Sequence, residues 1–378
     1  MLRWLTLLWL FVGLVALFSA SYAVASHEAG SGLYYFRNQL IWIAIGLVGF
    51  SVVVHSPMDR LLSIADWMLL FALGLIMMTL IPGVGSTVNG ATRWLALGPV
   101  AIQPSELIKP FLVMQSARVF GNWYRLNWSI RLTWVGIFAF VVGCILLQPN
   151  LSTAALCGLL VWMIALAGGL PFSYLMGAAG SGLCLAVLSV SVKSYQRRRI
   201  ISFLNPWADP MQDGYQLIQS LLAVGSGGLF GSGFGLSTQK LFYLPIQTTD
   251  FIFSVYAEEF GLIGGLILLV LLATYTTFGL RVAIKTRNPV HRLVAMGTVT
   301  LLIGQSILNI GVTTGMLPTT GLPLPMISYG GSSMLASLFT AGLLVRVARE
   351  SNTAEVISID QASDTARENK ARSPLSKA

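Results

Sequence analysis

The stretch TDFIFSVYAEEFGLIGGLILLVLLATYTTFGLRV, residues 249–282, decides the class of fold. From 252 to 282 it is almost wholly apolar, and a helix rises about 1.5 Å per residue, so this run exceeds the roughly 30 Å hydrocarbon core of a bilayer. We predict a membrane-spanning helix that tilts, kinks near Gly264 and Gly265, or begins outside the bilayer.

Similar apolar runs recur along the chain. Only 10% of its 378 residues are charged and its mean hydropathy is +0.76, whereas soluble domains are about one quarter charged. We therefore predict an all-α polytopic membrane protein with about ten transmembrane helices, at about 2–24, 39–55, 66–83, 104–120, 132–148, 151–170, 172–192, 252–282, 293–315 and 331–348.

The remaining segments define the predicted domain organisation. Residues 1–350 form one membrane domain, with a large loop at 193–250 between the seventh and eighth helices. Residues 351–378 are polar, mixed in charge and without apolar periodicity, which predicts a disordered tail.

The net charge of +9 is explained by membrane topology rather than by nucleic-acid binding. With the N-terminus in the cytoplasm, most Lys and Arg residues fall in cytoplasmic loops, as the positive-inside rule requires. We predict that both termini are cytoplasmic and that the 193–250 loop lies outside. The first 25 residues also resemble a signal peptide, but their apolar stretch is long and favours a retained helix.

Asp250 is the candidate catalytic residue. It stands directly before an apolar run, where a carboxylate loses hydration and is usually kept for a function or a partner. Two interpretations stay open, a helix N-cap and a general base. Glu258 and Glu259, further along the same helix, would suit a proton relay in a transporter.

Candidate ligand-binding residues are concentrated on the predicted outer side. Glu106 and Lys109 share a helix face and form either a self-neutralising pair or the polar floor of a site. The predicted outer cations could bind a phosphate or pyrophosphate, although lipid headgroups or interface anchoring explain them equally well; they are Arg93, Arg197, Arg198, Arg199 and Lys240.

Two segments predict irregular backbone. In NIGVTTGMLPTTGLPLPMISYGGSS, residues 309–333, three prolines and a glycine pair forbid a continuous helix, so we expect this segment to line a cavity that opens outward. Six glycines at 225–235 permit either a tightly packed or flexible turn or a phosphate cradle.

Several motifs together resemble the SEDS family (shape, elongation, division and sporulation). The 309–333 segment looks like the family signature, with Ser328, Gly330 and Gly331 in place. Further similar stretches are NGATRW at 89–94, QPSELIK at 103–109, SFLNPWADP at 202–210, GYQLIQSLLAVGSGGLFG at 214–231 and TDFIFSVYAEEFG at 249–261. Residues 205–207 and 239–245 resemble the division branch of the family more than the elongation branch.

The resemblance implies a function. Family members are peptidoglycan glycosyltransferases with ten transmembrane helices, which polymerise lipid II at the outer face of the bacterial cytoplasmic (inner) membrane. They work with a class B penicillin-binding transpeptidase, and in the division branch with other division proteins. The resemblance maps the essential aspartate of the family onto Asp250. It also maps the acid and the lysine of a second family motif onto Glu106 and Lys109. We add Ser328, Gly330 and Gly331 to the cations above as expected substrate-binding residues.

The expected reaction needs no organic cofactor, but a divalent cation, Mg²⁺ or Mn²⁺, could neutralise the leaving pyrophosphate; the sequence identifies no ligands for it. A lipid II flippase and a non-catalytic scaffold for the transpeptidase remain alternatives. This chain also departs from the family pattern, with Gln148, Asn150, Ile246 and Thr248 where acidic residues and a histidine are usual. We therefore expect Asp250 to act with few acid-base helpers.

Overall fold

The computed structural model describes residues 1–88, 91–98 and 100–372. In this part of the chain each of the ten predicted apolar runs forms a helix: α1 (Leu2–Ala29), α2 (Tyr34–His55), α3 (Met58–Thr79), α4 (Pro104–Gly121), α5 (Trp128–Leu147), α6 (Leu151–Ala167), α7 (Phe172–Val192), α10 (Ile252–Lys285), α11 (Pro289–Thr313) and α12 (Gly331–Arg372). Eight of them are long and apolar enough to cross a membrane, all except α4 and α6. The prediction of a polytopic all-α membrane protein is confirmed.

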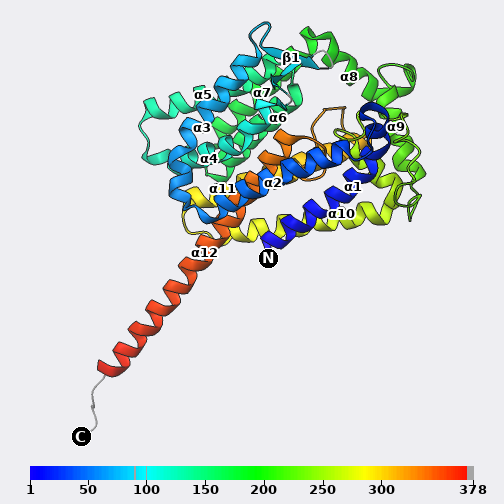
Figure 1. The fold of residues 1–378 in the computed structure, drawn as a ribbon. Coiled ribbons are helices and arrows are strands. Elements are labelled where there is room, and N and C mark those ends of the chain that lie inside the picture. Colours follow the sequence, from blue (N-terminus) through cyan, green and yellow to red (C-terminus); the bar gives the residue numbers. More distant parts are fainter. Residues whose placement is uncertain (89–90, 99, 373–378) are drawn as a thin grey trace.

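The helices pack around a centre made of α4, α11 and α12. α2 lies along α12, α3 along α4, and α1 against α10 and α2. α7 is peripheral, with Leu175 as its only buried residue (Figure 1). α4 carries polar residues that face this centre, which explains why it is less apolar than the outer helices.

The loops gather at two ends of the bundle. One end contains the strands at 85–88, 91–97 and 100–102, and we call it the sheet end. Here Arg93 donates to the carbonyls of Gln148 and Pro149, and Arg199 to that of Thr319. The sheet therefore lies together with the segments 148–150, 193–251 and 314–330. At the N-terminal end, the Met58 amide donates to Glu350 and the Tyr124 hydroxyl to the Gly169 carbonyl. We call this the N-terminal end because α1 begins there, and α12 leaves the bundle at the same end (Figure 1).

A small antiparallel sheet stands where the sequence predicted only a loop. It consists of β1 (Gly85–Val88), β2 (Ala91–Leu97) and β3 (Val100–Ile102), with Gly85 opposite Leu95 and Leu95 opposite Ile102. The sheet connects α3 to α4 and carries Arg93 on its middle strand. Pairing gives the backbone groups of this segment hydrogen-bond partners that a free loop would lack.

The 193–250 loop is partly helical. It contains α8 (Ser194–Leu204), a 3-10 turn η2 (Pro206–Ala208) and α9 (Tyr215–Ser226). The apolar stretch around Leu217 and Ile218 lies on α9. Both residues are buried and α9 packs on α10, whereas Leu222 is exposed, so the buried side of α9 meets protein.

The long α10 is broken at Gly261, whose backbone is left-handed (φ 65°, ψ −164°). Of the three alternatives that the sequence left open, the kink near Gly264 and Gly265 fits best, and the break lies three residues before Gly264. The glycine-rich turn fills the break, because the amides of Ser232 and Gly233 donate to the carbonyls of Glu258 and Glu259. In return the amides of residues 262 and 263 donate to the carbonyls of residues 228 and 229.

The break explains the glycines. A Cβ on Gly231 would lie 2.1 Å from the Glu259 carbonyl oxygen, and one on Gly227 2.2 Å from the Ala257 carbonyl oxygen. Real Cβ atoms essentially never approach that closely. The close-packing interpretation of the glycine-rich stretch fits, and its backbone amides are used in the fold.

The last helix is longer than predicted. α12 continues to Arg372 and projects from the bundle as a rod (Figure 1), where the sequence predicted a disordered tail from residue 351. Residues 351–372 contain neither Gly nor Pro, so no residue of the kinds that break helices interrupts them.

Candidate functional site

Asp250 lies in the turn before α10 and does not cap it. The helix begins at Ile252 with Phe251 as the N-cap residue and no side-chain cap bond. The N-cap interpretation is therefore wrong. The carboxylate is free for another role because the first turn of α10 does not use it.

The backbone around Asp250 is fixed by polar residues of other elements. The Asn309 amide on α11 donates to the carbonyl oxygens of Asp250 and Leu322, both at 2.8 Å. The Ser328 hydroxyl donates to the Thr249 carbonyl at 2.5 Å, and the Tyr329 amide to the Thr248 carbonyl at 2.9 Å. The irregular 314–330 segment therefore fixes the turn segment that carries Asp250.

Burial raises the pKa of Asp250 from 3.8 to about 6. The cations Arg199 and Arg93 oppose the rise, Glu106 adds to it, and a bond with Thr249 opposes it. Gly321 lies against the carboxylate, since a Cβ there would be 3.3 Å from Oδ2 of Asp250. Desolvation outweighs both arginines, so the carboxylate has a basicity suited to proton transfer near neutral pH.

The two arginines are held by backbone carbonyls. Arg93 on β2 donates through Nε to Gln148 (3.3 Å) and through Nη2 to Pro149 (2.7 Å). Burial lowers its pKa, Asp250 opposes this, and the charge of Arg199 adds to it. Arg199 on α8 donates to Thr319 at 3.0 Å and lies 4.7 Å from the Tyr195 ring centroid. Two cations from distant segments thus act on one carboxylate.

The three consecutive arginines at 197–199 do not act as a unit. Arg197 and Arg198 are exposed, and Arg198 pairs with Asp213 at 3.6 Å. A helix turns each successive residue by about 100°, so the three side chains point in different directions. The structure brings only Arg199 to Asp250.

Glu106 and Lys109 form a buried ion pair of 2.6 Å on α4. Lys109 also donates to Oε1 of Gln305 on α11 at 2.9 Å, and Gln305 in turn donates to the Pro323 carbonyl. The self-neutralising interpretation fits this geometry. The pair also contributes to the field at Asp250 and supports the 314–330 segment from below.

Ser328, Gly330 and Gly331 have structural partners. The Ser328 hydroxyl accepts from the Leu324 amide as well as donating to Thr249, and the Gly330 amide donates to Oε1 of Gln39. A Cβ on Gly331 would lie 2.4 Å from the Trp42 ring. Substrate binding by these three residues stays a prediction; the contacts described here are within the protein.

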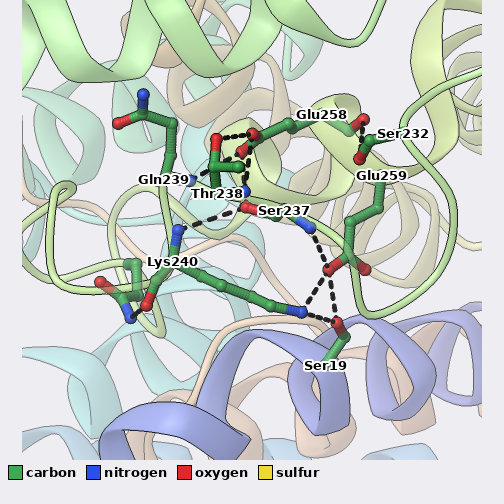
Figure 2. A network of polar contacts seen from close by, with 9 residues as sticks. Ser19, Ser232, Ser237, Thr238, Gln239, Lys240, Glu258 and Glu259 are labelled. Atoms are coloured by element: carbon green, nitrogen blue, oxygen red, sulfur yellow. Dashed lines mark hydrogen bonds and ion pairs between the residues drawn. The ribbon is translucent and has the colours of Figure 1, made fainter.

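The predicted assignment of Lys240 to the substrate-binding cations is corrected by the structure. The sequence placed it among the outer cations, but its side chain is buried and its ammonium donates to Ser19 and Glu259 (Figure 2). It is therefore committed to a pair inside the protein. Glu258 accepts from Ser237, Thr238 and Gln239, so this acid offers no support for a proton relay.

Sequence reasoning assigned no positioning role to three polar residues that hold the site. Gln39, Gln305 and Asn309 lie in apolar helices, and a polar amide in such a helix is a signal for an interior partner. Across the described residues no group of three or more His, Cys, Asp or Glu comes together to hold a metal. A cation at Asp250 would thus share its ligands with a bound phosphate, as Mg²⁺ commonly does.

The residues at 148–150 that depart from the family pattern make hydrogen bonds within the fold. Gln148 is buried and donates to Thr79 at 2.5 Å, while Asn150 caps α6 by accepting from the Thr153 amide. Arg93 donates to the Pro149 carbonyl in the same turn. This turn presents carbonyl oxygens, rather than carboxylates, to the site.

Comparisons with known proteins find close relatives. Residues 1–353 match the profile of the family FTSW_RODA_SPOVE, described as "Cell cycle protein". The chain is 57% identical to the "Probable peptidoglycan glycosyltransferase FtsW" of Synechocystis sp., over 94% of this chain and 91% of that protein. It is 36% identical to "Stage V sporulation protein E" of Bacillus subtilis, over 92% and 96%.

Solved structures share the fold. One, described as "Structural coordination of polymerization and crosslinking by a peptidoglycan synthase complex", superposes with a TM-score of 0.75 at 28% identity, over 93% of this chain and 97% of the other. The rod shape determining protein RodA of Thermus thermophilus gives a TM-score of 0.68 at 28% identity, over 92% and 96%.

Proposed function

The chain belongs to the FTSW_RODA_SPOVE family of cell cycle proteins, and on that premise we propose that it is a peptidoglycan glycosyltransferase. The substrate is lipid II, a disaccharide-peptide on a polyprenyl pyrophosphate, which the enzyme polymerises into glycan strands. The relatives bearing the name FtsW support a role in cell division.

One observation carries the proposal. Asp250 is a carboxylate of raised pKa, its backbone is fixed by Asn309 and Ser328, and Arg93 and Arg199 act on it from separate elements. A base and two cations at one point match a reaction that removes a proton and releases a pyrophosphate.

The reaction follows from this arrangement. Asp250 accepts the proton of the 4-hydroxyl of the acceptor sugar, and that oxygen attacks the anomeric carbon of the donor. The new glycosidic bond forms as the bond from the anomeric carbon to the pyrophosphate breaks, with inversion. Arg199 and Arg93 stabilise the charge that develops on the leaving pyrophosphate. A divalent cation, if bound, would further stabilise the charge on the leaving pyrophosphate.

The proposed setting is the bacterial cytoplasmic membrane. Both termini would be cytoplasmic and the sheet end would face outward, as the distribution of basic residues favours. A class B penicillin-binding transpeptidase is the proposed partner, supported by the similar protein in a synthase complex that couples polymerization to crosslinking.

The test is polymerisation by the full chain in proteoliposomes, with lipid II and the transpeptidase partner. Asp250→Asn should reduce glycan-strand formation at least about a hundredfold, the size of effect expected on removing a general base. Asp213→Asn, an exposed acid of the same loop, is the matched control and should keep wild-type activity.

Equal polymerisation by Asp250→Asn would refute the catalytic role. Translocation of labelled lipid II without any polymer would select the flippase instead. Normal cell division with Asp250→Asn would select the scaffold.

A further inference from the structure

A buried polar cluster lies outside the site just described. We call it the glutamate clamp and define it by Ser19, Ser237, Thr238, Gln239, Lys240, Glu258 and Glu259. Figure 2 shows it between α1, the start of α10 and the 237–240 turn. The cluster is notable because a charged pair is expensive to bury, and the proposed reaction does not use it.

One half of the clamp is an ion pair. Nζ of Lys240 lies 2.6 Å from Oε1 of Glu259, and their side chains are 7% and 1% exposed. Ser19 on α1 completes a triangle, since its hydroxyl accepts from Lys240 at 2.8 Å and donates to Glu259 at 2.6 Å. This half ties the loop to two helices.

The other half is a carboxylate that hydroxyl and backbone amide donors of the described residues satisfy. Glu258 accepts from the Ser237 hydroxyl (2.5 Å), from the amide and hydroxyl of Thr238 (both 2.9 Å) and from the Gln239 amide (3.3 Å). Both glutamates also use their carbonyls to accept from the glycine-rich turn at the break in α10. The clamp therefore sits where three chain segments meet.

The clamp is the upstream anchor of the chain that delivers Asp250. From Lys240 to Asp250 the backbone forms neither helix nor strand, and Phe242 and Ile246 adopt positive φ of 69° and 57°. Non-glycine residues hold such angles only where their surroundings enforce them. The buried Gln247 amide donates to the Lys240 carbonyl at 2.6 Å, which ties the segment back to the clamp.

We propose that Lys240 and Glu259 are positioning residues, whose ion pair holds the 241–250 segment so that Asp250 stays under the influence of Arg93 and Arg199. The downstream anchors, Asn309 and Ser328, fix only the last residues of the segment. Both anchors are needed because the segment between them lacks regular hydrogen bonding of its own. The inference rests on the proposed function for its kinetic test but not for its structural one.

The kinetic test uses the full chain in proteoliposomes with lipid II. Lys240→Met should lower kcat about tenfold to a hundredfold, the effect of displacing a catalytic group by about 1 Å, and leave KM within about twofold. The acid limb of the pH–rate profile should move to lower pH, because a looser Asp250 is better hydrated among Arg93, Arg199 and Glu106. Lys240→Arg, which keeps the cation, should recover most of the loss.

A double-mutant cycle isolates the pair. Lys240→Met leaves Glu259 as a buried charge, so Lys240→Met with Glu259→Gln should be less impaired than Lys240→Met alone. Arg118→Gln is the matched control, because it removes an ion pair with Asp66 at 2.9 Å at the N-terminal end of the bundle. It should leave the kcat and the pH profile at wild-type values.

Hydrogen exchange of the folded protein gives the readout that does not depend on activity. Lys240→Met should raise exchange at the 241–250 amides, and Arg118→Gln should not. Unchanged exchange there, or a lower yield of folded protein with wild-type kcat and pH profile, would overturn the proposal. If the wild type makes no polymer, the proposed function fails, while exchange still tests whether the pair fixes the segment.

Discussion

At the residue scale, the chemistry proposed for Asp250 depends on the environment of this residue rather than on its identity alone. Burial raises the pKa to about 6, against the opposing charges of Arg199 and Arg93. A base must be deprotonated to work, so kcat/KM should be constant near neutral pH and fall about tenfold per pH unit below about 6. Polymerisation rates from pH 5 to 8 measure this; a rate that stays constant down to pH 5 would contradict the raised pKa.

The same shift predicts an effect on stability. A raised folded pKa means that the folded state binds the proton more tightly than the unfolded state. The stabilisation from that proton is complete below about pH 4 and is lost as the pH rises through about 6. Asp250→Asn removes the charge from this half-buried side chain, so at pH 7.5 it should be more stable by about 1–3 kcal/mol.

Thermal unfolding in detergent at pH 7.5 and pH 5 checks this. The advantage of Asp250→Asn should shrink at the lower pH. A variant less stable than wild type at pH 7.5 would show that the two arginines, not desolvation, dominate the site.

At the element scale, α10 shows how one glycine decides a helix. The sequence predicted an overlong helix that tilts, kinks near Gly264 and Gly265, or begins outside the bilayer, and the structure has a break three residues before Gly264. The helix is broken at Gly261 because the glycine-rich turn enters there and supplies hydrogen bonds to the exposed backbone. Nothing in the spacing of apolar residues signals such a distant partner.

Gly231→Ala should test the break. Its Cβ would meet the Glu259 carbonyl, and its φ of 83° disfavours alanine, so we expect a loss of about 1–3 kcal/mol. The control is Gly265→Ala, whose Cβ meets only the Phe253 ring at 3.9 Å and should be neutral or stabilising by up to about 1 kcal/mol. Thermal unfolding of both variants measures the difference; a larger loss for Gly265→Ala than for Gly231→Ala would contradict the close packing at the Gly261 break.

At the scale of the whole molecule, the bundle has two chemically distinct ends. The sheet end carries Asp250, Arg93 and Arg199, and the N-terminal end carries the start of α1 and the exit of α12. Alternating spans place these ends on opposite sides of a membrane, whichever side each one faces.

Cysteine labelling should establish the orientation. In a Cys184→Ala background, Met211→Cys at the exposed sheet end should react with a membrane-impermeant maleimide in intact cells. Tyr124→Cys, exposed at the other end, should react only after permeabilisation. The opposite pattern would reverse the topology that the basic residues favour.

Several residues of the candidate site were predicted from the sequence, but the prediction also included residues that lie elsewhere. Asp250, Arg93 and Arg199 were predicted, and the structure brings them together. Lys240 was assigned to the same group because it lies in the same loop, yet it pairs with Glu259. Arg197 and Arg198 were included because they are adjacent, although helical rotation turns them away.

The sequence alone determined the membrane class and the ten apolar helices, and it made Asp250 a candidate, because apolar periodicity and the energetic cost of an unhydrated carboxylate are local properties. Only the tertiary structure decided which cations act on Asp250, that the glycine-rich turn fills the break at Gly261, and that Lys240 is an internal counterion. These depend on contacts between segments far apart in the chain. Burial sets both the pKa of an acid and the partner of a charge, and burial exists only once the helices have packed.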